Sequence, residues 1–200
     1  MLMDWWGYLV AGIAWLGPAS HLPSMRRIIA HKTADGMTPV LCGIATLSYG
    51  AWGGLVLGME TRMVLVLCAS ATLSLVTFLY VLRHNQGSFW YFMAWLAAAI
   101  ACGVTAWRWN FIGVFIVVPI DLAWYVRAVR DLRKSIAGKA VSVWGWGMSV
   151  SANTAWTVAA IIERKWAVAI HSGVLAGAAG VVMVWTWVVH RRHGAIIQQG

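Results

Sequence analysis

The sequence has few charged residues and almost no acidic ones. Only 10% of its 200 residues are Asp, Glu, Lys or Arg, and six residues are acidic, whereas soluble domains carry about 25% charged residues. Apolar residues make up 61% of the chain, and the mean hydropathy is +0.73. This composition excludes an ordinary soluble domain and predicts an all-α integral membrane protein.

Cysteine is scarce, and its spacing predicts neither a disulfide framework nor a zinc site. Cys42, Cys68 and Cys102 each lie inside an apolar stretch, and none belongs to a Cys-x-x-Cys pair. The sequence also has no His-Glu-x-x-His pattern and no visible pairing of a nucleophile with a base. We therefore expect no metal, no cofactor and no enzyme activity.

Charged or Gly/Pro-rich breaks divide the chain into seven apolar segments. Each is close to the length of about 20 residues that crosses a bilayer as a helix. The predicted spans are residues 5–25, 39–57, 63–82, 89–107, 110–126, 141–162 and 166–189. The loops between them are short, so any functional site must lie among the helices.

The distribution of positive charge predicts the orientation of the spans. The loops after spans one, three and five, together with the C-terminal tail, hold eleven of the fifteen Lys and Arg residues. Because positive residues stay on the cytoplasmic side during insertion, we expect the N-terminus outside and the C-terminus in the cytoplasm. The expected location is a cell membrane, either an inner or a plasma membrane. The net charge of +9 then needs no nucleic-acid partner.

Two similar basic turns predict an internal repeat. Residues 32–36 read KTADG and residues 134–138 read KSIAG, an offset of 102 residues. Two inserted residues raise the offset to 104, which then places Trp52 on Trp156. Spans one to three and spans five to seven therefore look like two copies of one unit.

A three-helix unit can be repeated in parallel only if one further helix separates the copies. We predict a first bundle over residues 1–86, a linker helix over 87–108 and a second bundle over 109–200. Parallel repeats of this kind are related by an axis along the membrane normal. Their substrate site lies near mid-depth between the two halves.

Several residues carry a resemblance to a known family. The plan of three, one and three spans, Pro23 at the cytoplasmic end of span one, the two K-[ST]-x-x-G turns and Trp52 in span two resemble the SWEET sugar transporters. These belong with the SemiSWEETs to the PQ-loop and MtN3/saliva group. The resemblance covers nearly the whole chain. It departs at Ser24, where family members often have glutamine after the proline. It also departs at Tyr125, which stands in the second half at the position that aligns with Pro23.

The resemblance implies a passive carrier that moves a mono- or disaccharide through the bilayer by alternating access. It assigns Trp52 and Trp156 to the sugar pocket. Cys68 and Ser172, sixteen positions later, stand where the family has asparagines. Serine offers fewer hydrogen bonds than asparagine and cysteine offers very few. Asn153, three residues before Trp156, is the nearby amide that would compensate.

The resemblance also implies hinges and a gate. Pro23, Pro39 and Pro119 correspond to hinges of the rocking movement, since a proline inside a helix removes a backbone hydrogen bond. Pro119 lies almost two turns before the position that aligns with Pro23. His21, one turn before the basic end of span one, is expected to act in gating or in structural hydrogen bonding.

Asp121 is the only acidic residue inside a predicted span. An acidic group at this depth lines a cavity or pairs with a partner. One interpretation gives Asp121 a hydrogen bond to a substrate hydroxyl or a role in proton coupling. The other makes it half of a structural pair, with His21 or with a polar residue of span six.

Two alternatives to sugar transport remain open. One is a proton-coupled PQ-loop carrier of an amino acid or another small polar solute, with Asp121 as the coupling group. The other is a membrane interaction protein that keeps this fold without transporting anything, because the asparagines of the sugar pocket are missing. In every case the partners are the lipid bilayer and, for a carrier, a small molecule, with homo-oligomers left open.

Overall fold

The computed structural model describes residues 12–13, 15–56, 61–135, 138–162, 164 and 166–197. Within these ranges the chain is helical apart from turns and contains no strand, so the predicted all-α class is confirmed for this part of the chain. Residues 5–11 and 14 of the first predicted span, residue 57 of the second and residues 136–137 of the second turn lie outside the described residues.

The helices follow the predicted spans and extend past several of them. They are α2 (Leu16–Ala19), α3 (His21–His31), α4 (Pro39–Val56), α5 (Thr61–His84), α6 (Phe89–Arg108), α7 (Asn110–Lys134), α8 (Val143–Ile162) and α9 (Trp166–Ile197). α7 and α9 continue beyond the predicted ends at residues 126 and 189. Arginine and lysine are good helix formers, so a helix need not end where its apolar stretch ends.

Three helices in the described part of the chain are long and apolar enough to cross a membrane. The stretches are Leu65–His84, Phe89–Arg108 and Ala169–Arg192. They support a membrane location for the chain.

The first predicted span is interrupted five residues before its predicted end. Only Ser20 separates α2 from α3, and its φ of −61° and ψ of −24° are those of a helix. Pro23 follows three residues later and has no N–H to bond the carbonyl of Ala19. The proline therefore accounts for the break between α2 and α3.

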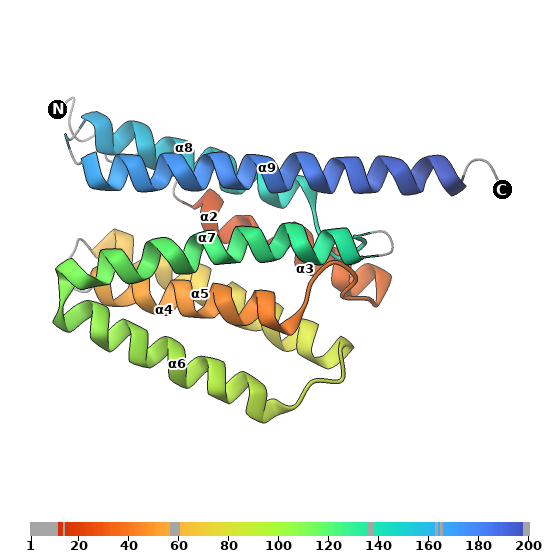
Figure 1. The fold of residues 1–200 in the computed structure, drawn as a ribbon, viewed down its shortest axis with the longest axis horizontal. Coiled ribbons are helices and arrows are strands. Elements are labelled where there is room, and N and C mark those ends of the chain that lie inside the picture. Colours follow the sequence, from red (N-terminus) through yellow and green to blue (C-terminus); the bar gives the residue numbers. More distant parts are fainter. Residues whose placement is uncertain are drawn as a thin grey trace.

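The helices pack as a ring with one helix outside it. Going round, α2–α3, α5, α4, α7, α9 and α8 each contact the next, and α8 returns to α2 and α3. α6 lies outside the ring against α4, with smaller contacts to α7 and α5 (Figure 1). In the first half of the chain, α5 lies between α2–α3 and α4. In the second half, α9 lies between α7 and α8.

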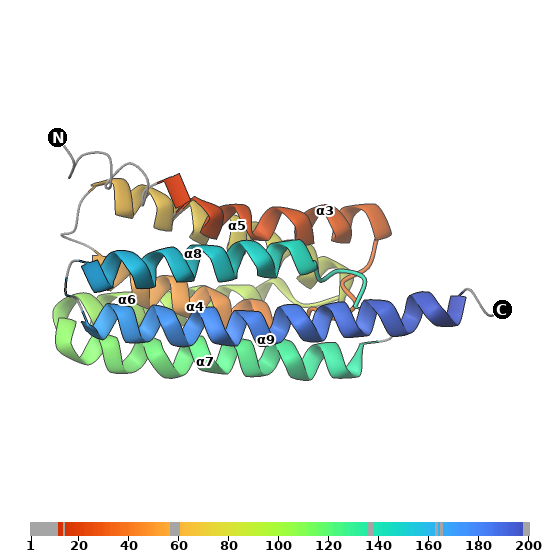
Figure 2. The same cartoon turned by 90° about the horizontal axis from the view of Figure 1, so that it is seen from above.

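From α3 onward, helices that follow one another in the sequence run in opposite directions, so the ring neighbours α3 and α5 are parallel, and so are α7 and α9 (Figure 1). α3, α5, α7 and α9 all finish at the same end of the molecule, where the C-terminus also lies (Figures 1 and 2). We call this the basic end, because the turn at residues 32–38, the described part of the second turn at residues 138–142 and the Arg and Lys residues that close these helices are found there.

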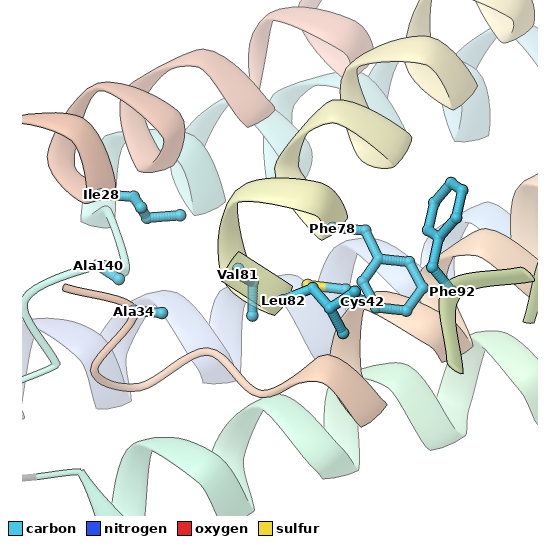
Figure 3. Packing of buried hydrophobic residues seen from close by; sticks show 8 residues of the cluster. All are labelled: Ile28, Ala34, Cys42, Phe78, Val81, Leu82, Phe92 and Ala140. Atoms are coloured by element: carbon cyan, nitrogen blue, oxygen red, sulfur yellow. The ribbon is translucent and has the colours of Figure 1, made fainter. Parts of the chain in front are cut away.

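Apolar packing joins the two turns at the basic end. Figure 3 shows Ala34 of the first turn and Ala140 of the second beside Ile28 of α3 and Val81 of α5. The full cluster of buried side chains is Ile28, Ala34, Cys42, Phe78, Val81, Leu82, Phe92 and Ala140. This core therefore connects the first three helices to a turn of the second half.

Glycines allow α6 to approach α4 closely. A Cβ atom added to Gly54 would collide with the carbonyl oxygen of Gly103, and one added to Gly103 would lie 2.7 Å from the carbonyl oxygen of Gly50. Small residues permit such close backbone approach between membrane helices. The contact between α4 and α6 therefore depends on the absence of side chains at these positions.

We expect Gly54→Ala to destabilise the protein by about 1–3 kcal/mol, because the added methyl group would force α6 away from α4. Gly177→Ala in α9 is the matched control, since a Cβ there meets nothing within 4 Å. It should be neutral or stabilising, because alanine is the better helix former. Thermal unfolding of both purified variants in one detergent compares them. An equal loss of stability in both would contradict the close contact.

Candidate functional site

A cavity of about 240 Å³ lies inside the ring of helices. Its described walls come from every element of the ring: α2 with Ser20, α4, α5, α7, α8 and α9. None of the described residues of α6 lines it. A space enclosed by six helices is the place where side chains distant in sequence converge.

The walls of this cavity repeat between the two halves of the chain. Most lining residues that follow the basic turns fall into pairs, which are 104 residues apart up to the end of α4 and α8 and 105 apart afterwards. The offset grows because α9 begins ten residues after Trp156, whereas α5 begins nine after Trp52. The pairs are Ser48 and Ala152, Tyr49 and Asn153, Trp52 and Trp156, Leu67 and Ser172, and Ser70 and Leu175.

Asp121 is the centre of a buried polar cluster in this wall. The Ser48 hydroxyl donates to its Oδ1, and the Trp52 indole N–H donates to its Oδ2 at 3.1 Å. Nε2 of His171 lies 3.1 Å from the same Oδ2. Because Asp121 is only 2% exposed, its carboxyl group depends on these partners from α4 and α9.

The cluster explains how an acidic group is accommodated inside the bundle. A buried charge is costly unless it is paired and hydrogen-bonded. When Nε2 of His171 carries a proton, three donors converge on the Asp121 carboxylate. The partner histidine is His171, and His21, named as a possible partner from the sequence, instead bonds the Tyr49 hydroxyl at 2.8 Å.

The two predicted pocket tryptophans both line the cavity, but they are held differently. Trp52 bonds Asp121, and its ring centroid lies 5.3 Å from that of His171. Trp156 makes no hydrogen bond and no ring contact with the described residues. Its indole N–H is therefore not engaged by any of the described residues.

Two more of the predicted polar contacts lie in the same cavity. Ser172 is buried in the wall formed by α9. Asn153 lines the wall formed by α8, and its amide nitrogen donates to the backbone carbonyl of Ser149 at 2.9 Å. The Asn153 side-chain carbonyl remains an acceptor that can face an occupant.

Cys68, which the resemblance assigned to the sugar pocket, does not line the central cavity. It is exposed and lines a separate groove between α4, α5 and α6. The α5 side chains that reach the cavity are Val66, Leu67 and Ser70. A helix turns by about 100° per residue, so a position one or two residues away from these faces another direction.

A layer of ring side chains separates the cavity from the basic end. Trp146 of α8 lies with its ring centroid 5.8 Å from that of Trp124 and 5.7 Å from that of Tyr125. His21 and its partner Tyr49 lie on the facing side. Only a small cavity of about 60 Å³ remains among Trp124, Trp146, His21 and their neighbours. The predicted gate residue His21 thus lies between the central cavity and the basic end.

The two basic turns meet beyond this layer. Gly36 and Gly138 have φ values of 86° and 58°, a left-handed conformation that favours glycine. A Cβ on Gly36 would lie 3.1 Å from Cα of Gly138. The N–H of Ala140 donates to the carbonyl of Asp35 at 3.0 Å, and that of Lys139 to the Asp35 carboxylate at 3.3 Å. Main-chain contacts therefore hold the turns together.

The predicted hinge prolines occupy three different settings. Pro23 lies in α3, three residues after the break at Ser20. Pro39 is the first residue of α4, where a missing N–H costs no helical hydrogen bond. Pro119 lies inside α7 and removes one bond from the middle of that helix.

Ser48, Tyr49 and His171 were not assigned to the site from the sequence. The first two had a usable signal, because they stand 104 residues before Ala152 and Asn153 and so share the offset of the two tryptophans. His171 could be placed neither on the cavity side nor on the lipid side of its span. Its role depends on the rotation of α9 about its axis.

Asp121→Ala removes the acceptor of donors from two other helices, so we expect a stability loss of about 2–4 kcal/mol. Ser48→Ala removes one of these bonds and should cost about 1 kcal/mol. The matched control is Ser151→Ala, because Ser151 is exposed and bonds only the Gly147 carbonyl of its own helix. Unfolding in a single detergent ranks the three variants. Stability of Asp121→Ala equal to that of the control would contradict the cluster.

The chain was also compared with known proteins. It matches no family model, no curated protein and no solved structure.

Proposed function

We propose that this chain is a SWEET-like carrier that moves a small sugar across a cell membrane by facilitated diffusion and alternating access. The observation that carries the proposal is the central cavity, lined at equivalent positions of both halves and containing Trp52 and Trp156. In this proposal residues 1–86 and 109–200 form two parallel three-helix bundles. The helix within 87–108 links them.

The order of the helices in the ring supports two parallel copies. Exchanging α2–α3, α4 and α5 for α7, α8 and α9 leaves the sequence of contacts round the ring unchanged. The close approach of Gly36 to Gly138 has the same basis, because equivalent points can touch each other only on the symmetry axis. The place of α6 outside the ring suits a linker.

The chemistry of the cavity favours a neutral polyhydroxy solute. Indole rings offer flat apolar faces for the C–H face of a sugar ring. The hydroxyl and amide groups of Ser70, Ser172 and Asn153 suit its hydroxyls. No described Lys or Arg lines the cavity, and the carboxyl of Asp121 is already engaged by three partners. An ionic substrate would therefore find no unpaired counter-charge among these residues.

Alternating access requires the basic end to open. The interlocked turns and the layer around Trp124 and Trp146 close the cavity on that side, which the charge distribution assigns to the cytoplasm. In the proposed cycle, the bonds from Asp35 to Lys139 and Ala140 break when substrate is released inward. The two bundles then move apart at this end and together at the other.

The contact between Asp121 and His171 favours a second candidate. Two ionisable side chains that touch inside a membrane bundle can take up and release a proton, as such residues do in proton relays. The chain would then be a proton-coupled carrier of an amino acid or another small polar solute. Dependence of uptake on a pH gradient distinguishes it from the sugar uniporter.

The first test is uptake of labelled mono- and disaccharides by proteoliposomes. Trp156→Ala should lower sugar uptake at least tenfold, because the indole of Trp156 contacts the substrate directly in the proposal. Trp52→Ala should lower it by a similar factor. Trp144→Ala is the matched control, since Trp144 is 80% exposed on the same helix as Trp156, and it should leave uptake unchanged. Wild-type uptake by folded Trp156→Ala protein would exclude the pocket.

Uptake by the same proteoliposomes distinguishes the candidate functions. The uniporter should equilibrate sugar without a pH gradient. Accumulation of an amino acid or other small polar solute that follows a pH gradient and disappears in Asp121→Asn would instead identify the proton-coupled carrier. Folded protein that moves no tested solute would favour a membrane interaction protein.

A cross-link tests the opening of the basic end. In a variant without Cys42, Cys68 and Cys102, we expect Asp35→Cys and Lys139→Cys to form a disulfide on oxidation, because these residues are in contact. Uptake should stop on oxidation and return after reduction. Asp35→Cys alone controls for oxidation damage. Full uptake by the cross-linked protein would show that the turns need not separate.

A further inference from the structure

A groove of about 470 Å³ runs between α7 and α9. Its apolar walls include Leu122 and Val126 of α7 with Ala178 and Val181 of α9. Val126 is 69% exposed and Val181 is 61% exposed, so the groove opens on the outer side of the ring and not toward the central cavity. In a membrane these side chains face lipid.

Two arginines of α7, Arg130 and Arg133, line the same groove towards the basic end. Neither forms an ion pair with an acidic side chain in the described ranges. The nearest acidic residue, Asp131, is buried on another side of α7, where it pairs with Arg127 at 2.8 Å. The positive charge of Arg130 and Arg133 is therefore not neutralised by an acidic side chain among the described residues.

Cation–π contacts with tryptophans indicate the depth of these arginines in the bilayer. The Arg133 guanidinium lies 4.9 Å from the ring centroid of Trp185, and that of Arg191 lies 4.1 Å from the ring centroid of Trp187. Tryptophans concentrate where lipid headgroups meet the hydrocarbon. The tryptophans and arginines together place this end of the groove at headgroup depth.

The length of the groove fits one leaflet. From Leu122 to Arg133 the helix advances eleven residues, which is about 16 Å at a rise of ~1.5 Å per residue. Half of a hydrocarbon core of about 30 Å is ~15 Å. The apolar walls therefore match the depth of a lipid acyl chain when the arginines lie among the headgroups.

We infer that the groove between α7 and α9 binds an anionic phospholipid. One acyl chain lies against Val126, Ala178 and Val181, and the phosphate is bound by Arg130 and Arg133. Arginine forms charge-assisted hydrogen bonds with phosphate oxygens, and a second positive charge favours a headgroup with net negative charge over a zwitterionic one. This site does not depend on the proposed transport function.

Native mass spectrometry of the detergent-purified chain tests the site. Phosphatidylglycerol and phosphatidylcholine with identical acyl chains are titrated separately. We expect tighter binding of phosphatidylglycerol, and a loss of about fivefold in its affinity for each arginine replaced by glutamine. The Arg130→Gln/Arg133→Gln double variant should therefore bind it at least tenfold more weakly.

The matched control is Arg26→Gln/Arg83→Gln, which removes the same charge from exposed positions on α3 and α5 near the same end. It should bind phosphatidylglycerol as the wild type does. Val126→Trp fills the groove without changing charge, and it should also weaken binding with both arginines present. Equal losses in the two double variants, equal wild-type affinity for both lipids, or unchanged binding by Val126→Trp would each overturn the proposal.

Discussion

A carboxyl group in the middle of a helical bundle must be surrounded by donors, and this requirement orients the helices that carry them. Ser48 and Trp52 lie one turn apart on α4, so one face of that helix supplies two donors to Asp121. His171 supplies the third partner from α9. Because α4, α7 and α9 are neighbours in the ring, these contacts fix how each helix is turned about its own axis. The direction of the other cavity-facing side chains on these helices follows from that rotation.

A second set of contacts closes the ring at the basic end. There the backbone of Asp35 bonds the backbone of Ala140, while the hydroxyl of Thr38, the last residue of the first turn, donates to the carboxylate of Asp131 in α7. The central cavity lies between this closure and the Asp121 cluster. The Asp121 cluster and the contacts at the basic end differ in kind. The cluster ties one helix of the first half to two of the second, whereas the turns are joined mainly through main-chain atoms and small side chains.

Sequence patterns predicted much of the fold, and their limits are physical. Six described helices start within about two residues of the predicted spans, because apolar length and charged breaks govern where a membrane helix begins. The first predicted span could be compared only beyond residue 11. The offset between the two halves, 104 residues after the two inserted positions, also paired Trp52 with Trp156, and the structure brings both to one cavity. A fixed spacing of sixteen residues failed to bring Cys68 to the cavity. One extra residue in the connection before α9 changes the register, and a single-residue shift turns a helical position by about 100°. His171 could not be assigned for the same reason, since hydropathy sets the length of span seven but not its rotation.

The cavity walls repeat in position but not in chemistry. Ala152 occupies the place of Ser48, and Asn153 that of Tyr49. A bound molecule therefore meets different groups when it is turned by half a rotation about the axis, so it has a single preferred orientation. A carrier built in this way would distinguish the two faces of its solute, whereas an exactly symmetric lining would accept the solute equally well after half a rotation about the axis.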